Sequence, residues 1–234
     1  IGLCPHMKNR PLGGRMFISL WRDDMRLKET LEAYQKNDPA ARSKLEIFLL
    51  YSGLHATIDY RIAHWFYRHR MKLIARWISQ SSRRRTGIEI HPAATIGRRL
   101  VIDHGNGVVI GETVQIGDDC LIYQGATLGG TGITQGKRHP TLGNNIMVGS
   151  GSKVLGPITV GDNSKIAANS VVLRDVPPNC TVVGIPGHIV RFQGEKLDHV
   201  HTPDPLQLEI DALKERLAIL EDQLEAKEKN DVSV

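Results

Sequence analysis

Two histidines lie at the two places where a six-residue spacing of aliphatic residues is interrupted. His104 follows Asp103 in IDHGNGVVI, and His139 follows Arg138 at the end of GGTGITQGKRH. Histidine titrates near neutral pH, so an imidazole can take a proton from an alcohol, which speeds a reaction about 10²–10⁴-fold. Such a base needs a carboxylate to fix its tautomer, and Glu89 and Asp103 are the nearby candidates. These residues predict general-base chemistry on a hydroxyl group.

Zinc binding is the alternative use of these histidines. A zinc site built from histidines needs three of them to converge, and no pair of histidines between residues 87 and 194 has a short ligand spacing. We expect His91 and His188, near the two ends of that segment, to be surface residues. The sequence therefore predicts no metal site.

The segment from residue 87 to residue 194 repeats every six residues. Thirteen branched aliphatic residues follow this spacing, whereas a helix needs a period of 3.6 and an ordinary strand a period of 2. The segment also holds 19 of the 23 glycines. We interpret it as a left-handed parallel β-helix of hexapeptide repeats, in which these aliphatic residues point to the axis: Ile90, Ile96, Ile102, Ile110, Ile116, Ile122, Leu128, Leu142, Val148, Val154, Val160, Ile166 and Val172.

Three repeats close one triangular coil in this interpretation. Coils stack at ~4.8 Å, so about five of them form a prism of roughly 24 Å. The period gains two residues between Ile102 and Ile110, and fourteen residues separate Leu128 from Leu142. Function in a solenoid usually lies in such insertions, because the coils are scaffolding. Both histidines belong to these insertions.

The aromatic residues define a second region. Ten of the twelve lie between Phe17 and Trp77, where apolar residues recur at helical spacing. We expect four short helices within an α-helical domain over residues 17–86, with Asp38 as a helix N-cap and Pro39 at the first helical position. Residues 1–16 read as a disordered leader or an expression remnant. The fold class is α+β, with the β-helix over residues 87–194.

The C-terminal segment, residues 195–234, reads as an acidic tail with a short amphipathic helix. Ile210, Leu213, Leu217, Leu220 and Leu224 form a heptad seam. A coiled coil and a helix packed on its own subunit explain this seam equally well.

Charge and composition exclude several classes of protein. The 234 residues carry a net charge of +5, but residues 204–234 hold nine acidic and four basic side chains, which leaves +10 for residues 1–203. This basic body suits an anionic ligand, and we do not expect it to bind a nucleic acid. No stretch reaches ~20 apolar residues, so a membrane span is not expected. Three unpaired cysteines favour a cytoplasmic protein.

The β-helical segment contains the motifs GIEIHPAA at 87–94, IDHG at 102–105, GVVIGET at 107–113, TLGGTG at 127–132 and KRHP at 137–140. The helical segment adds DPA at 38–40 and YSGLH at 51–55. In these motifs the chain resembles serine O-acetyltransferases from about Phe17 to Arg191, and it is closest to their short form. The resemblance implies transfer of an acetyl group from acetyl-CoA to the hydroxyl of L-serine, which yields O-acetylserine for cysteine biosynthesis.

The resemblance also implies roles for the site residues. His104 is the expected general base, with Glu89 in the place of the family's paired carboxylate. His139 matches a second histidine at the serine site, and the fork of Arg138 suits the serine carboxylate. Asp38 and Asp103 match acidic residues that bind the substrate amine. Acetyl-CoA is expected along Gly130, Ser150 and Ala168, with Lys165 near a phosphate.

The resemblance implies partners as well. These are a homotrimer with active sites between subunits, or a dimer of trimers, and cysteine as a feedback inhibitor. The family commonly docks a C-terminal isoleucine into O-acetylserine sulfhydrylase, and Val234 predicts weaker binding or none. Acetylation of a sugar or xenobiotic hydroxyl, or a β-helix that only binds partners, are the alternative functions.

Overall fold

A computed structural model describes residues 27–132, 135–193, 195–196, 214 and 216–217. The predictions for residues 1–16, for Val234 and for most of the heptad seam lie outside these ranges. The chain divides into two compact units, residues 1–195 and 196–234. In the second unit the described residues Lys214, Arg216 and Leu217 are helical.

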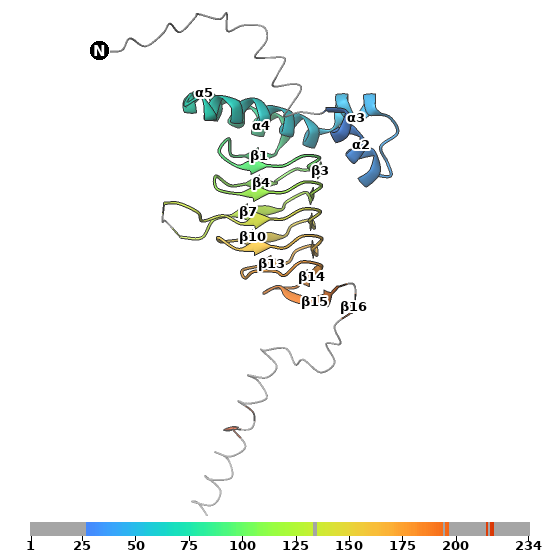
Figure 1. Ribbon diagram of the computed structural model, residues 1–234, viewed down its shortest axis with the longest axis vertical. Coiled ribbons are helices and arrows are strands. Elements are labelled where there is room, and N and C mark those ends of the chain that lie inside the picture. The colour runs from blue at the N-terminus through green and yellow to red at the C-terminus, as the bar shows by residue number, and fades with distance from the viewer. Residues whose placement is uncertain (1–26, 133–134, 194, 197–213, 215, 218–234) are drawn as a thin grey trace, which may run out of the picture. The chain divides into compact units, whose positions relative to one another are not determined.

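The first unit begins with helices that lie across one end of a stack of β-coils (Figure 1). Four helices fall within the described ranges: α2 (Leu27–Asn37), α3 (Lys44–Leu50), α4 (Ser52–Arg68) and α5 (Lys72–Thr86). Gly87 ends α5 in the left-handed conformation that glycine adopts most readily, with φ at 73°.

The prediction that Asp38 caps a helix is wrong. Helix α3 begins six residues later, at Lys44, and the side chain of Ser43 accepts the capping hydrogen bond from the Glu46 N–H. Ser43 and Glu46 stand at the spacing of a capping box, which explains why the helix begins there. Asp38 instead accepts a hydrogen bond from the Ala40 N–H at 2.8 Å and so closes a turn between α2 and α3. Its carboxylate is therefore not committed to a helix end.

The coils form a three-sided parallel β-helix, whose sides we call faces A, B and C. Face A consists of β1 (Glu89–Ile90), β4 (Val109–Ile110), β7 (Thr127–Gly129), β10 (Lys153–Leu155) and β13 (Val171–Val172). Face B consists of β2 (Thr95–Ile96), β5 (Gln115–Ile116), β8 (Thr141–Leu142) and β11 (Thr159–Val160). Face C holds β3 (Val101–Asp103), β6 (Leu121–Tyr123), β9 (Met147–Val148), β12 (Lys165–Ile166), β14 (Cys180–Val183) and β15 (His188–Phe192).

The thirteen predicted axial residues are all buried, none of them more than 5% exposed. They stack on one another in register, as in the pairing of Ile90 with Ile110 and of Ile110 with Leu128. A second buried column, which the period-six analysis did not include, lies two residues before the first. It contains aliphatic residues such as Ile88 and Val108, and the fully buried Ser152 and Ser164, whose hydroxyls donate to backbone carbonyls. Each hexapeptide therefore directs two side chains toward the interior of the β-helix.

The pairing register measures the length of each coil. Leu142 pairs with Val160, 18 residues along the chain, as three hexapeptides require. Ile90 pairs with Ile110, 20 residues along, and Ile116 with Leu142, 26 residues along. The chain passes from one face to the next at three corners. We name each corner after the two faces that it joins, in chain order: AB, BC and CA. The two extra residues fall at corner CA between β3 and β4, and the eight extra residues at corner AB between β7 and β8.

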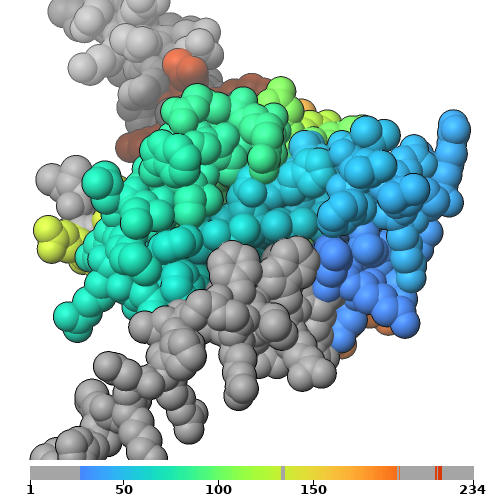
Figure 2. Space-filling model, turned by 90° about the horizontal axis from the view of Figure 1, so that it is seen from above, coloured from blue at the N-terminus to red at the C-terminus, as the bar shows by residue number. Residues whose placement is uncertain are grey.

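Side chains of the helices close the open end of the β-helix, where the first coil has no further strand to pair with. Tyr60 donates to the Ala94 carbonyl at 2.6 Å, Ser79 to that of Ile90 at 2.7 Å, and Arg61 to those of Ile96 and Gly97. Tyr34 bonds to Ile102 in the same way. Figure 2 looks down on this end, where the helices lie across the coils. Edge closure of this kind prevents an exposed strand from pairing with another chain.

Helix α4 packs on the coils through Gly53, Ala56 and Tyr60, and of its apolar residues at helical spacing, Leu54, Ile58, Ile62, Trp65 and Phe66, only Leu54 is fully buried. Small residues are needed there because backbone comes close: a Cβ added to Gly53 would lie 2.0 Å from the Ile102 carbonyl oxygen. This close approach places the beginning of α4 directly on β3.

Candidate functional site

His104 lies in the insertion at corner CA. Each of the first three turns at this corner contains a left-handed glycine, Gly107 in the turn of His104 itself and Gly125 and Gly151 in the next two. The two extra residues add two more left-handed positions, His104 (φ 58°) and Gly105 (φ 79°). Residues other than glycine seldom adopt a positive φ, although histidine does so more readily than most, and Arg99 and Asp119 also adopt it in this β-helix. The insertion therefore presents an exposed His104 side chain at the corner, in a backbone conformation that the repeat does not require.

The helical region holds this insertion through hydrogen bonds to its backbone. The Ser52 hydroxyl donates to the His104 carbonyl at 3.2 Å, and Tyr34 bonds to both backbone groups of Ile102. Asp38 joins the same cluster, since Tyr51 donates to its carboxylate at 2.5 Å and packs edge-on against Tyr34. The structure therefore brings Asp38, from the turn after α2, to the corner that carries His104.

The pKa of Tyr51 reflects the negative charge of this cluster. The hydrogen bond to Asp38, followed by burial, raises the pKa of the Tyr51 hydroxyl to about 12, and the charge of Asp103 adds to this shift. Tyr51 therefore stays protonated and remains a donor to Asp38 at neutral pH. Two carboxylates at this corner provide what a substrate ammonium group requires.

Glu89 begins β1 on face A, next to the turn that carries His104. The Gly107 N–H donates to the Gly87 carbonyl at 2.9 Å, which stacks the turn against the residues just before Glu89. The Glu89 carboxylate forms an ion pair with Arg83 at 3.3 Å. Within the described ranges the structure gives no hydrogen bond between Glu89 and His104. Catalytic hydrogen bonds are often long without substrate and shorten when it binds.

His139 lies at the end of the longer insertion, at corner AB, where Thr113 of the preceding coil organises it. The Thr113 hydroxyl oxygen accepts from the N–H groups of Arg138 and His139, at 3.1 and 3.2 Å. The Thr113 N–H and O–H donate to Nδ1 of His139, at 3.3 and 2.9 Å. Sequence reasoning missed this role of Thr113, and the resemblance in GVVIGET at 107–113 was the only signal for it.

These contacts fix the tautomer of His139. A backbone N–H can only donate, so Nδ1 is unprotonated and the ring proton lies on Nε2. Burial, followed by the charge of Arg138, lowers the pKa of His139 and keeps the imidazole neutral. The Nε2 edge lies between Gly111 and Gly130, since a Cβ added at those positions would be 2.2 and 3.1 Å from Nε2. His139 therefore offers an Nε2–H donor in a gap that two glycines leave open.

Arg138 lies beside His139 and is held by Glu112. One terminal nitrogen of the guanidinium donates to the Glu112 carboxylate at 2.8 Å. The two side chains are 31% and 37% exposed, so the remaining guanidinium donors can still reach a ligand from solvent. A guanidinium fork with free donors can bind a carboxylate through both oxygens.

The four residues expected along acetyl-CoA do not meet in a single chain. Ser150 and Ala168 stack at corner CA, between β9 and β10 and between β12 and β13. Gly130 lies at corner AB, and Lys165 is exposed on face C. His104 and His139 are divided in the same way, with one at corner CA and the other at corner AB, the width of face A apart. One chain therefore presents two half-sites.

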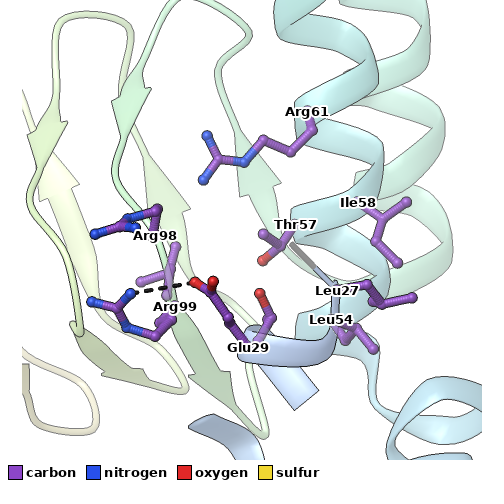
Figure 3. Close-up of a pocket in the computed structure, with 10 residues that line it drawn as sticks. Leu27, Glu29, Leu54, Thr57, Ile58, Arg61, Arg98 and Arg99 are labelled. Atoms are coloured by element: carbon purple, nitrogen blue, oxygen red, sulfur yellow. Dashed lines mark hydrogen bonds and ion pairs between the residues drawn. The ribbon is translucent and has the colours of Figure 1, made fainter. Parts of the chain in front are cut away.

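A small cavity lies elsewhere, between α2, α4 and corner BC. It is lined by residues that include Glu29, Thr57, Arg61 and Arg99 and holds about 20 Å³ (Figure 3). That is room for one water molecule and not for a substrate. None of the predicted site residues lines this cavity, and the two histidines lie at corners CA and AB.

Neither a membrane-crossing helix nor a cluster of metal-ligating side chains occurs in the described ranges. None of the helices there is long and apolar enough to cross a membrane. In those same ranges no three His, Cys, Asp or Glu side chains are grouped so that they could hold a metal ion.

Comparison with known proteins identifies the family. The model for bacterial transferase hexapeptide (six repeats) matches residues 139–174. A serine acetyltransferase of Synechococcus elongatus is 55% identical over 193 residues, which are 81% of this chain and 79% of that protein.

Two solved structures extend the similarity to the fold. The Brucella abortus serine acetyltransferase in complex with coenzyme A is 39% identical with a TM-score of 0.71, over 75% of this chain and 72% of that one. The soybean serine acetyltransferase complexed with serine is 38% identical with a TM-score of 0.71, over 75% and 74%. The predicted helical domain followed by a left-handed parallel β-helix is confirmed. With this fold and this degree of identity, the chain belongs to the serine acetyltransferase family of acyltransferases.

Proposed function

We propose that this protein transfers the acetyl group of acetyl-CoA to the hydroxyl of L-serine and releases O-acetyl-L-serine and CoA. The observation that carries the proposal is the pair of insertions in an otherwise regular stack. They present His104 with two carboxylates at one corner, and Arg138 with His139 at another. The solved relatives of the same fold bind serine and coenzyme A, which are the two ligands this chemistry needs.

His104 acts as the general base in this proposal. It takes the proton of the serine hydroxyl while the oxygen attacks the thioester carbonyl, and Glu89 orients the imidazole and stabilises its charged form. The attack forms a tetrahedral oxyanion, and the C–S bond then breaks to release CoA thiolate. The Nε2–H of His139 donates a hydrogen bond to the substrate or to this intermediate.

The remaining residues bind the two substrates. Arg138 holds the serine carboxylate, while Asp38 and Asp103 hold its ammonium group. Backbone groups at Gly130, Ser150 and Ala168 line the path of acetyl-CoA, and Lys165 pairs with one of its phosphates.

A complete site is formed between two subunits of a homotrimer. Corner CA of one subunit supplies His104, Ser150 and Ala168, and corner AB of its neighbour supplies Arg138, His139 and Gly130. The separation of these corners within one chain supports this arrangement. The oligomer is this homotrimer or a dimer of two such trimers. We place the protein in the cytoplasm, with cysteine as a competing ligand because its thiol replaces the serine hydroxyl, and with weak or no sulfhydrylase binding through Val234.

Activity measurements test the reaction. Serine, homoserine and sugars are offered with acetyl-CoA, and release of free CoA is recorded. Serine should be the preferred acceptor, and His104→Ala should reduce turnover at least about a hundredfold without dissociating the oligomer. Preference for a sugar, or near-normal turnover of His104→Ala, would refute the proposal.

A mixing experiment tests the shared site. His104→Ala and His139→Asn subunits are each expected to be inactive alone. Unfolding and refolding them together should restore roughly a quarter of the wild-type activity, because one in four interfaces then joins two intact corners. If each chain carried a complete site, the mixture would stay inactive.

A further inference from the structure

β3, the first strand of face C, has an open edge where the turn that carries His104 begins. β3 pairs with β6 on one side, and none of the described strands pairs with it on the other. The N–H and C=O of Ile102 point to the open side, while the Val101 N–H donates to the next coil. Unpaired backbone groups leave a strand free to shift. His104 is two residues further along this strand.

Tyr34 takes the place of the missing strand. Its hydroxyl donates to the Ile102 carbonyl at 3.3 Å and accepts from the Ile102 N–H at 3.1 Å. The Tyr34 side chain is fully buried. Burial raises the pKa of the hydroxyl, so it stays protonated and keeps both functions. One phenol thus satisfies both backbone groups that the strand leaves open.

The beginning of α4 fixes the same stretch of backbone from a second direction. The Ser52 hydroxyl donates to the His104 carbonyl. The missing side chain of Gly53 lets α4 rest on the Ile102 carbonyl, and a Cβ there would also lie 2.7 Å from the Tyr34 hydroxyl. Backbone from Ile102 to His104 is therefore held by groups that lie more than 45 residues earlier in the chain.

We propose that Tyr34 is a positioning residue for the general base. By closing the edge of β3 at Ile102, it sets the backbone from which Asp103 and His104 project, and Ser52 fixes the carbonyl at the end of that turn. Tyr34 touches no substrate in this role. The inference rests on the proposed acetyl transfer to serine, because it assigns Tyr34 its effect through His104.

The chain offers a matched control in Tyr60. It is also a buried tyrosine, 2% exposed, whose hydroxyl donates to the backbone of the same coil, at Ala94. Ala94 lies between β1 and β2, at corner AB, and not beside the His104 turn. Tyr34→Phe and Tyr60→Phe therefore remove comparable buried hydroxyls from one coil, but only the first frees the catalytic turn.

The test compares steady-state kinetics and melting temperature for the wild type and four variants: Tyr34→Phe, Tyr60→Phe, His104→Ala and the double variant Tyr34→Phe/His104→Ala. Both tyrosine variants should melt lower than the wild type. Tyr34→Phe should lower kcat for serine about tenfold or more with an unchanged KM for acetyl-CoA, while Tyr60→Phe stays within about twofold. The double variant should be no slower than His104→Ala, because Tyr34 acts only through that residue.

Three results would overturn the inference. Equal kcat values for the two tyrosine variants would show that the hydroxyl only stabilises the fold, and an additive loss in the double variant would show that Tyr34 acts independently of His104. Absence of serine acetylation by the wild type would refute the proposed function together with this inference. If Tyr34→Phe does not fold, Ser52→Ala carries the same test, with a smaller loss of kcat that must also vanish in the His104→Ala background.

Discussion

Gly111 is the position from which the role of His139 can be tested without touching any polar group. It lies at corner AB, and a Cβ added there would be 2.0 Å from Cδ2 and 2.2 Å from Nε2 of His139. The backbone of Gly111 is not in the left-handed region, so alanine is compatible with its conformation. Gly111→Ala therefore acts as a steric wedge against the imidazole.

The size of the effect follows from the geometry. Ordinary contact begins at 3.4 Å, so the ring must move by about 1.2–1.4 Å. Displacement by about 1 Å can cost around 10²-fold in rate, so we expect kcat/KM for serine to fall about 10–100-fold, or roughly 1.4–2.7 kcal/mol. The movement also weakens the two bonds between Thr113 and Nδ1, each of which contributes about 0.5–1.5 kcal/mol to stability.

Gly129→Ala is the control, because it adds the same methyl group one strand away. Its Cβ would meet the flexible end of Leu155, at 2.8 Å, and not His139. Initial rates of CoA release and urea denaturation are measured for both variants, with oligomeric state checked by gel filtration. We expect Gly129→Ala to stay within about threefold of the wild type in kcat/KM. If folded Gly111→Ala did the same, the position of the His139 ring would not matter for the reaction, and the proposed donor role would be wrong.

Three further predictions concern the pH dependence of stability, the orientation of His139 and the buried axis of the β-helix. Burial lowers the pKa values of His139 and His91, so the unfolded chain binds protons more readily below about pH 6.5. The free energy of unfolding should therefore fall as pH drops from about 6.5 to 5, and urea titrations should show a weaker dependence in His139→Gln. Thr113→Val should lower kcat/KM about tenfold in the serine assay, since it removes the hydroxyl that orients His139. Ile122→Ala should cost about 2–5 kcal/mol in urea denaturation because Ile122 is fully buried on the axis.

The scaffold was predictable because a β-helix has one buried position per short strand. Ile96, Ile116 and Leu142 must stack on a narrow axis, which imposes size and branching at fixed intervals and leaves a period in the sequence. The second buried column was less visible, since it accepts aliphatic residues and serine alike, as Val108 and Ser152 show. Serine is accepted there because its hydroxyl donates to the backbone of the turn.

The helical region was less predictable, because its positions are determined by contacts with the β-helix. Asp38 before Pro39 has the pattern of an N-cap, but its carboxylate serves a turn and the Tyr51 hydroxyl. The fit of Gly53 on Ile102 depends on residues about 50 positions apart. Neither contact leaves a periodic signal in the sequence, so before the structure only the resemblance connected Asp38 with the site of His104.

The division of the site between two corners was present in the sequence, however. Each hexapeptide forms one face, so the corner of any insertion follows from counting axial residues before it. Ile102 is the third axial residue and Leu128 the seventh, so the insertions after them fall at corners CA and AB. Two insertions separated by a multiple of three faces would stack at one corner and could share a site within one chain. Four faces separate these two, so one chain holds His104 and His139 at different corners, and this separation supports the proposed site between two subunits.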